Sequence, residues 1–292
     1  MRRTCKHGFA GVVEVQALLR YVQETVRPLA IVDHALKHLT VIVLACFVAP
    51  LAFAADLTAR SVADALFRAT TPVDFASKDL SFLDLAGLDF KKARLTGANL
   101  YGADLNRASL KGANLEGAKL DNAIVTRSDF SSANLKGATL LSVTAFATLE
   151  PDRTDAPNFE NANLRGAHIA ARLDGANFRN ANLSEARIGL LIATWGSYRP
   201  RAVFNGADFT SAKLVRADLH KGVFQFTKFL GADLTGAKLA DCDFTKADLT
   251  GANFAGADVA GADFDGAILT NATGLDMALG RDSAKNLDKS IR

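Results

Sequence analysis

Apolar residues recur at every fifth position over most of the chain. From Phe75 onward a leucine or phenylalanine stands at nearly every fifth residue, and a small residue, mostly alanine, lies two positions before it. Glycine often lies two positions after it, as in ARLTGANLYGADLNRASLKGANLEG from Ala93. The pattern returns at Phe159, slips by one residue before Phe178, and is unbroken from Phe204 to Leu269. Most of the chain is therefore one long internal repeat.

A period of five excludes both regular secondary structures. On an α-helix five residues advance the side chain by about 500°, so the leucines would spiral around every face. On a flat strand an odd period sends alternate leucines to opposite faces. A backbone that turns a corner every five residues brings all the leucines inside, with Asn, Asp and Gly at the corners. This arrangement predicts a square solenoid whose coils stack about 4.8 Å apart.

Four sides to a coil predict a longer repeat, which the sequence contains. Four phenylalanines are spaced by 20 residues: Phe204, Phe224, Phe244 and Phe264. Two sets of charged residues alternate in sign at the same spacing: Asp208, Lys228 and Asp248, and Asp218, Lys238 and Asp258. We expect the rings to stack as a ladder and the opposite charges on neighbouring coils to attract modestly. About eight coils are expected between Asp74 and Thr270.

The motif A(D/N)LXX, repeated over about two thirds of the chain, resembles that of the pentapeptide-repeat family. The resemblance implies an all-β fold, a right-handed quadrilateral parallel β-helix with short helical caps. The β-helix is expected over 74–270, with irregular segments at 141–158 and 189–203, the first replacing about one coil. The resemblance says less about function, although the best-known members resemble DNA in shape and charge and bind DNA gyrase.

The ends of such a solenoid need covers, because they expose unpaired strand edges. Residues 56–73 are expected to form a helical N-terminal cap, since Val62, Leu66 and Ala69 share one helical face. Residues 271–292 are expected to form a C-terminal cap or tail that contains a short helix.

Residues 1–55 have the features of an export signal. Leu39 to Ala55 carries no charge, basic residues precede it, and Ala52-Phe53-Ala54 follows Pro50. This layout is typical of a secretory signal peptide cleaved near Ala54. The sequence therefore predicts a bacterial protein exported to the periplasm or secreted.

The residues of this segment also allow three other interpretations. The first is an uncleaved anchor, which would be the protein's one contact with a membrane, although the apolar stretch is shorter than the roughly 20 residues of a span. The second is lipidation at Cys46, which bulky Leu44 disfavours. The third concerns the unusual length of the signal, from which we expect translation to start near Val26.

Charge argues against nucleic acid as a partner. The formal net charge is +3, and basic and acidic residues are equal in number from Ala55 onward. A neutral body has no strong field for binding DNA or RNA, and a DNA mimic needs a continuous acidic face. The alternating ladders interrupt two faces, although Asp84 and Asp104 share a third. We therefore favour an exported scaffold over a cytoplasmic gyrase-binding DNA mimic.

The residues that carry most enzyme chemistry are sparse. Cys5, Cys46 and Cys242 are too few and too scattered for a disulfide framework or a zinc cluster. Cys242 occupies a small inward position, which favours a substitute for alanine over a nucleophile. Asp263 to Gly266 resembles the start of a calcium loop, but Ile268 stands where that loop requires glycine. We expect no catalytic residues, no cofactor and no metal.

The best local candidate for a binding site is the segment 189–203. It contains Trp195, Tyr198, Arg199 and Arg201, and these residue types are enriched at the energetic centres of protein interfaces. We interpret the four residues as a loop that binds a protein partner, whose identity the sequence does not name. The alternative is that Trp195 folds back and covers a gap in the stack.

Overall fold

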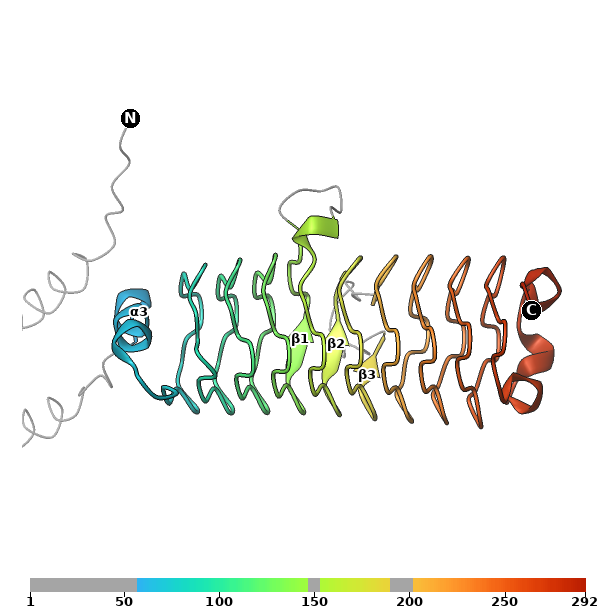
Figure 1. Ribbon diagram of the computed structural model, residues 1–292, viewed down its shortest axis with the longest axis horizontal. Helices are drawn as coiled ribbons and strands as arrows, with labels where there is room; N and C mark the ends of the chain where they lie inside the picture. Colours follow the sequence, from blue (N-terminus) through green and yellow to red (C-terminus); the bar gives the residue numbers. More distant parts are fainter. Residues whose placement is uncertain (1–56, 147–152, 190–201) are drawn as a thin grey trace, which may run out of the picture. The chain divides into compact units, whose positions relative to one another are not determined.

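The computed structural model describes residues 57–146, 153–189 and 202–292, which form a parallel β-helix (Figure 1). In chain order the elements are α3 (Ala59–Arg68), β1 (Thr139–Leu141), η1 (Arg153–Asp155), β2 (His168–Ala170), β3 (Arg187–Ile188), η2 (Leu275–Met277), η3 (Arg281–Ser283) and η4 (Leu287–Lys289). The three strands pair in parallel in the order β1-β2-β3, with Thr139 opposite His168 and His168 opposite Arg187. Most other sides contribute a single parallel bridge.

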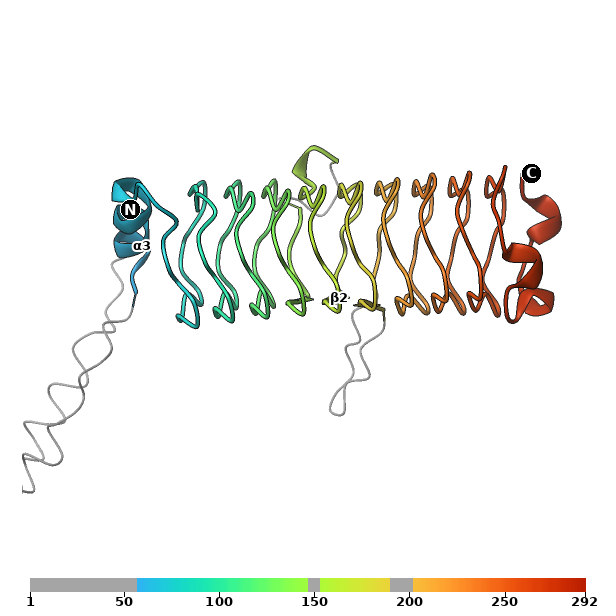
Figure 2. The same cartoon turned by 60° about the horizontal axis from the view of Figure 1, so that its bottom comes forward.

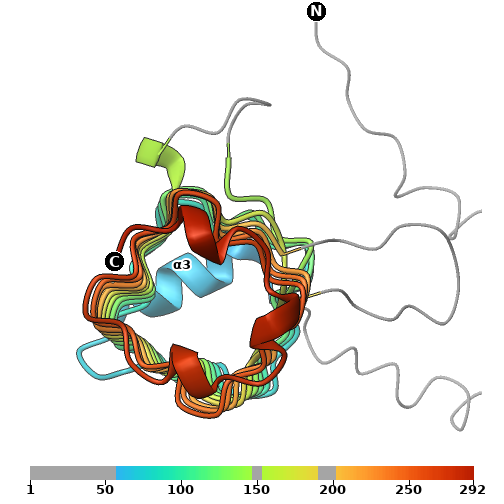
Figure 3. The same cartoon turned by 90° about the vertical axis from the view of Figure 1, so that its right-hand side faces the viewer.

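Each coil has four sides, seen end-on in Figure 3. In the first coil the bridging residues are Asp74 on side 1, Asp79 on side 2, Asp84 on side 3 and Asp89 on side 4, each paired with the residue 20 positions later. This spacing confirms the predicted superperiod. Side 1 runs through nine successive bridges from Asp74 to Thr273, so the stack is about one coil longer than the eight predicted.

The interior is filled by the repeating alanines and leucines. Residues such as Leu100, Leu105 and Leu110 are completely buried, and so are most alanines two positions before them. Each buried leucine contributes about 1.5–3 kcal/mol before entropy is counted. The corners require a left-handed backbone, which Gly97 (φ 63°) adopts without steric cost and Asn122 (φ 59°) tolerates.

Two ladders of phenylalanine rings run through this core. On side 3, Phe204, Phe224, Phe244 and Phe264 stack with centroids 5.4–5.5 Å apart, as the sequence predicts. A second ladder on side 4 joins Phe130, Phe159, Phe178, Phe209 and Phe229, with successive centroids 4.7–5.0 Å apart. The ladders touch edge to face, for example between Phe204 and Phe209 at 5.5 Å. Offset and edge-to-face pairs are the favoured aromatic geometries.

The first irregular segment differs from its prediction. Leu141 belongs to β1, Thr144 still bridges Ile124, and the side 4 bridge resumes from Asp129 to Asn158. The coil is therefore retained, and a first excursion, residues 146–157, is inserted at the corner between sides 3 and 4. At its base the Asp155 carbonyl accepts a hydrogen bond from the Arg127 backbone N–H at 2.7 Å, which closes the ladder below it.

A second excursion, residues 189–202, is inserted at the corner between sides 2 and 3. Before it, Arg187 bridges Asp218, and after it Val203 bridges Arg172. The slip in the sequence pattern arises where His168 and Arg172, four residues apart, occupy consecutive sides. Residues 190–201 lie outside the described residues.

The C-terminus continues the β-helix where a capping helix was expected. The segment after Thr270 forms one more coil, in which Leu279 bridges Asp258, Lys285 bridges Asp263 and Ile291 bridges Ile268. Its bridging residues are six apart, and each corner is a short 3-10 turn, η2, η3 or η4. The residues before these turns, Gly274, Gly280 and Asn286, are all left-handed.

At the opposite end α3 packs against the first coils. Thr58 and Ser61 form a capping box that satisfies backbone groups at the start of the helix. Val62 and Leu66 are buried in the continuous core, while Ala69 follows the helix as its C-cap. None of the helices within the described ranges is long and apolar enough to span a membrane.

Candidate functional site

Both excursions leave the β-helix at the two edges of the same side. The first begins beside Phe146, after side 3 has bridged at Thr144, and the second returns to side 3 at Val203. Figures 1 and 2 show η1 projecting from the edge of the stack near the level of β1. The two points of insertion therefore lie at opposite edges of side 3, with Arg172 on the coil between them.

Buried carboxylates hold the bases of the excursions. Asp155 at the end of η1 is almost fully buried and forms an ion pair with Arg127 at 2.6 Å. Asp174 is also buried, accepts a hydrogen bond from the Asn205 N–H at 2.7 Å, and pairs with Arg172 at 2.6 Å. Charge-assisted hydrogen bonds of this kind are short and strong. These contacts tie Asp155 and Asp174 to neighbouring coil residues near the two points of insertion.

One exposed aromatic residue on this face breaks the rules of the repeat. Phe226 stands at the corner after side 3, is 53% exposed, and has a left-handed backbone with φ 57°. The left-handed conformation costs a bulky residue about 1–2 kcal/mol, and the exposed ring gains little from burial. The ammonium group of Lys246 lies 5.4 Å from the ring centroid. Phe82, at the corner between sides 2 and 3, has the same combination of a left-handed backbone and an exposed ring.

The four residues predicted to bind a partner are not placed by the structure. Trp195, Tyr198, Arg199 and Arg201 lie outside the described residues, so both interpretations of Trp195 remain predictions. The structure does show how the segment leaves the coil. Gly189 lies against the next coil so closely that a Cβ there would be 2.9 Å from the His220 carbonyl oxygen. Sequence reasoning missed Phe226, although Phe82 and Phe226 are the two aromatic residues at a corner position that otherwise carries Gly or polar residues in the described coils.

The charged ladders lie in the predicted register. Asp208, Lys228 and Asp248 are consecutive on side 4, and Asp218, Lys238 and Asp258 are consecutive on side 2. Lys238 lies 3.5 Å from Asp218. Burial tends to raise the pKa of Asp218, but its contacts with the His220 ring at 2.5 Å and with Lys238 outweigh burial and lower the pKa below its usual value. Sides 2 and 4 therefore present mixed charge.

Side 3 is not continuously acidic either. Asp84 and Asp104 are neighbours on it, as the spacing predicts, and Asp243 and Asp263 are neighbours further along. Between the two pairs, side 3 carries Ile124, Thr144, Arg172, Val203 and Val223. The middle of the face, beside the excursions, is thus largely apolar.

The candidate reactive groups serve the fold. Cys242 is buried, and its thiol lies 3.0 Å from the Leu219 carbonyl oxygen. Ser128 and Thr227 occupy equivalent inward positions, and each donates a hydrogen bond to the carbonyl 23 residues earlier. The Asp263 carboxylate accepts hydrogen bonds from the Asp265 N–H and the Asn286 side chain. Within 57–146, 153–189 and 202–292 no group of three or more His, Cys, Asp or Glu residues is placed to hold a metal ion.

These features define a class, the parallel β-helical repeat protein with a packed core and four bridges per coil. The family described as "Pentapeptide repeats (8 copies)" matches residues 79–112, 108–140, 158–188, 200–225, 223–254 and 232–271. The matches together cover more than half of the chain. The chain belongs to the pentapeptide-repeat family.

Several solved structures are similar to parts of this chain. HetL from the cyanobacterium Nostoc sp. strain PCC 7120, involved in heterocyst differentiation regulation, is 25% identical over 75% of this chain and 89% of its own, with a TM-score of 0.37. QnrB1, a plasmid-mediated fluoroquinolone resistance protein, is 20% identical over 70% of this chain and 84% of its own, with a TM-score of 0.41. A pentapeptide repeat protein of the Arabidopsis thaliana thylakoid lumen is 32% identical over 40% of this chain and 69% of its own, with a TM-score of 0.23. No curated protein matches the chain.

Proposed function

We propose that this protein is an exported, non-catalytic scaffold that presents side 3 and the two excursions to a protein partner. The observation that carries the proposal is that both excursions leave the edges of one side while the phenylalanine ladder on side 4 continues past both. Loops on a rigid scaffold are common sites of recognition. The right-handed sense of the coil, which the family resemblance implies, belongs to the same proposal.

The chemistry of this face suits a protein better than a polyanion. Val203, Val223 and Phe226 offer apolar contact area, and Arg172 adds a cation whose position Asp174 sets. The predicted loop residues Trp195, Tyr198, Arg199 and Arg201 would add aromatic and arginine groups beside them. Such combinations dominate the energetic centres of interfaces.

Export is the second part of the proposal and rests on the pattern of residues 1–55. The test is fractionation of the native host, with intact-mass measurement of the recovered protein. A chain that begins near Ala55 in an extracytoplasmic fraction supports export. A full-length or internally initiated chain in the cytoplasm would overturn it, and a gyrase supercoiling assay would then test the DNA-mimic alternative, which the mixed charge of sides 2 and 4 disfavours.

Partner binding is tested by cross-linking in the compartment where the protein is found. Phe226→Ser and Trp195→Ala are expected to reduce a specific cross-linked product, because both remove apolar contact area from the proposed face. Phe67→Ser is the matched control, since Phe67 is 86% exposed but lies on α3. A product that all three variants reduce equally, or that none reduces, would contradict side 3 as the interface.

A further inference from the structure

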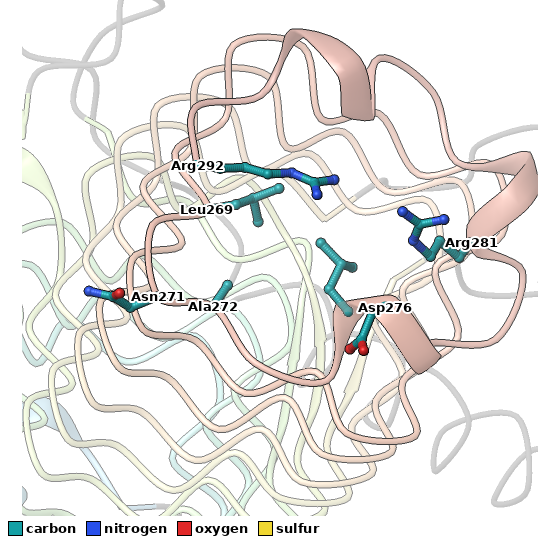
Figure 4. Close-up of a pocket in the computed structure, with 7 residues that line it drawn as sticks. Leu269, Asn271, Ala272, Asp276, Arg281 and Arg292 are labelled. Atoms are coloured by element: carbon teal, nitrogen blue, oxygen red, sulfur yellow. The ribbon is translucent and has the colours of Figure 1, made fainter.

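The last coil contains a cavity of about 300 Å³, shown in Figure 4. It is lined by Leu269, Asn271, Ala272, Leu275, Asp276, Arg281 and Arg292. Leu269 and Leu275 belong to the hydrophobic core, so the cavity reaches the end of the core itself. Its volume lies at the small end of the range for ligand sites, roughly 300–1,000 Å³.

The six-residue repeat of this coil makes one lining residue exceptional. Leu275, Arg281 and Leu287 each follow the left-handed residue of a corner and begin a 3-10 turn, so they are equivalent positions. Leu275 is buried, and Leu287 packs partly buried against the core. Arg281 therefore places a guanidinium group where the same coil elsewhere places a leucine side chain.

The two arginines of the cavity have no acidic partner among the described residues. Several other arginines of the β-helix do have one, such as Arg165 with Glu185 at 3.1 Å. In Figure 4 the guanidinium groups of Arg281 and Arg292 extend toward each other across the cavity, while the carboxylate of Asp276 points away from them. The site thus combines two unpaired cations with an apolar floor.

We propose that this cavity binds a small amphipathic carboxylate. The carboxylate would lie between Arg281 and Arg292, since guanidinium groups suit planar two-oxygen anions. A short apolar body would cover Leu269, Ala272 and Leu275 and remove their surface from water. The two guanidinium groups favour a ligand that carries a negative charge.

The first experiment is calorimetric titration of the full chain with octanoate at low salt. Saturable one-to-one binding that weakens as salt is added supports the proposal, because salt screens partly exposed charges. Octylammonium and inorganic phosphate are the matched probes, one with the apolar body and the opposite charge, and one with an anion but no apolar body. Binding of either probe as tightly as octanoate would overturn the proposal.

Variants distinguish binding at this cavity from attraction of the ligand to the general charge of the protein surface. Arg281→Leu restores the leucine of the six-residue pattern, so the fold is expected to keep or gain thermal stability while octanoate affinity falls at least about tenfold. Arg292→Gln is expected to weaken binding as well, and Arg281→Lys to retain part of it. Arg187→Gln, on side 2, is the control and should leave the affinity unchanged. An Arg281→Leu protein that binds octanoate like the parent would contradict the site.

Discussion

The β-helix turns its corners in one way where its sides have five residues and in another way in the last coil, where they have six. In the coils from Asp74 to Leu269, most corners use a single left-handed residue, and the leucines and phenylalanines fill the interior. In the last coil a 3-10 turn follows each left-handed residue, and the interior opens into a cavity. The cavity thus lies in the coil whose sides have six residues in place of five.

The largest effect is expected from a break in the packed coils. Phe209→Ala removes a ring that stacks on Phe178 at 4.7 Å and Phe229 at 5.0 Å and also meets Phe204 edge to face. The free energy of unfolding should fall by about 3–5 kcal/mol, because the neighbouring rings cannot close the space. Urea denaturation followed by circular dichroism measures this loss. Phe67→Ala on α3, where the ring is exposed, should cost almost nothing, and equal losses would contradict the ladder's importance.

A smaller effect is expected when a corner glycine is replaced by alanine, and its size should differ between the two kinds of corner. Gly256 and Gly280 are both left-handed, but a Cβ at Gly256 meets open space, whereas one at Gly280 lies 2.5–2.8 Å from Ala260, mostly its backbone. Gly256→Ala should cost only the conformational penalty, about 1–2 kcal/mol. Gly280→Ala should at least double that cost locally. Faster hydrogen exchange at the amides of Leu279 and Lys285 in the second variant alone would show it.

The smallest effect concerns the ion pairs on the five-residue sides. Because the pKa of Asp218 is lowered in the folded protein, this carboxylate stabilises the fold above its unfolded pKa of about 3.9 and loses that contribution as pH falls through its lower folded value. Asp218→Asn should cost a few tenths of a kcal/mol at pH 7, since exposed pairs are screened. At pH 2 the two proteins should unfold at nearly the same urea concentration. A difference that grows as pH falls would contradict this origin.

Fixed spacing explains which parts of the fold could be predicted. The buried leucines, the ladder from Phe204 and the register of Asp218 with Lys238 all follow from counting in steps of five and 20. The side 4 ladder could not be counted in this way, because the excursions and the slip give its bridges spacings of 29, 19 and 31 residues. Only the closed coils show that Phe130, Phe159 and Phe178 belong with Phe209.

The last coil was missed although its signal is present. Gly274, Gly280 and Asn286 are spaced by six, and so are Asp276, Asp282 and Asp288. Three short repeats at a chain end carry less weight than a period of five sustained over most of the molecule. Arg281 becomes informative only after Leu275 and Leu287 are shown to occupy equivalent positions in the coil.

The position of the predicted binding loop, unlike the register of the coils, does not follow from the sequence. The sequence gives the types of residue in the loop. It does not give the position of Trp195, which depends on contacts with residues that are distant in the sequence. The face beside it was also hidden from the sequence, because the relation of the two excursions to side 3 depends on how each coil closes. Phe226 lies at an edge of that face, and its left-handed backbone conformation is known only from the structure.

The continuity of the side 4 ladder has a consequence for how such a protein can change over time. Asp129 and Asn158 meet as bridge partners although 29 residues separate them, and Phe130 stacks on Phe159 at 5.0 Å across the same gap. The entropy cost of closing a loop grows only slowly with its length. New segments can therefore be spliced into a corner, lengthened or exchanged, while the coils on either side keep their alignment. Each corner of the β-helix can therefore accept an insertion without a change in the stacking of the other coils.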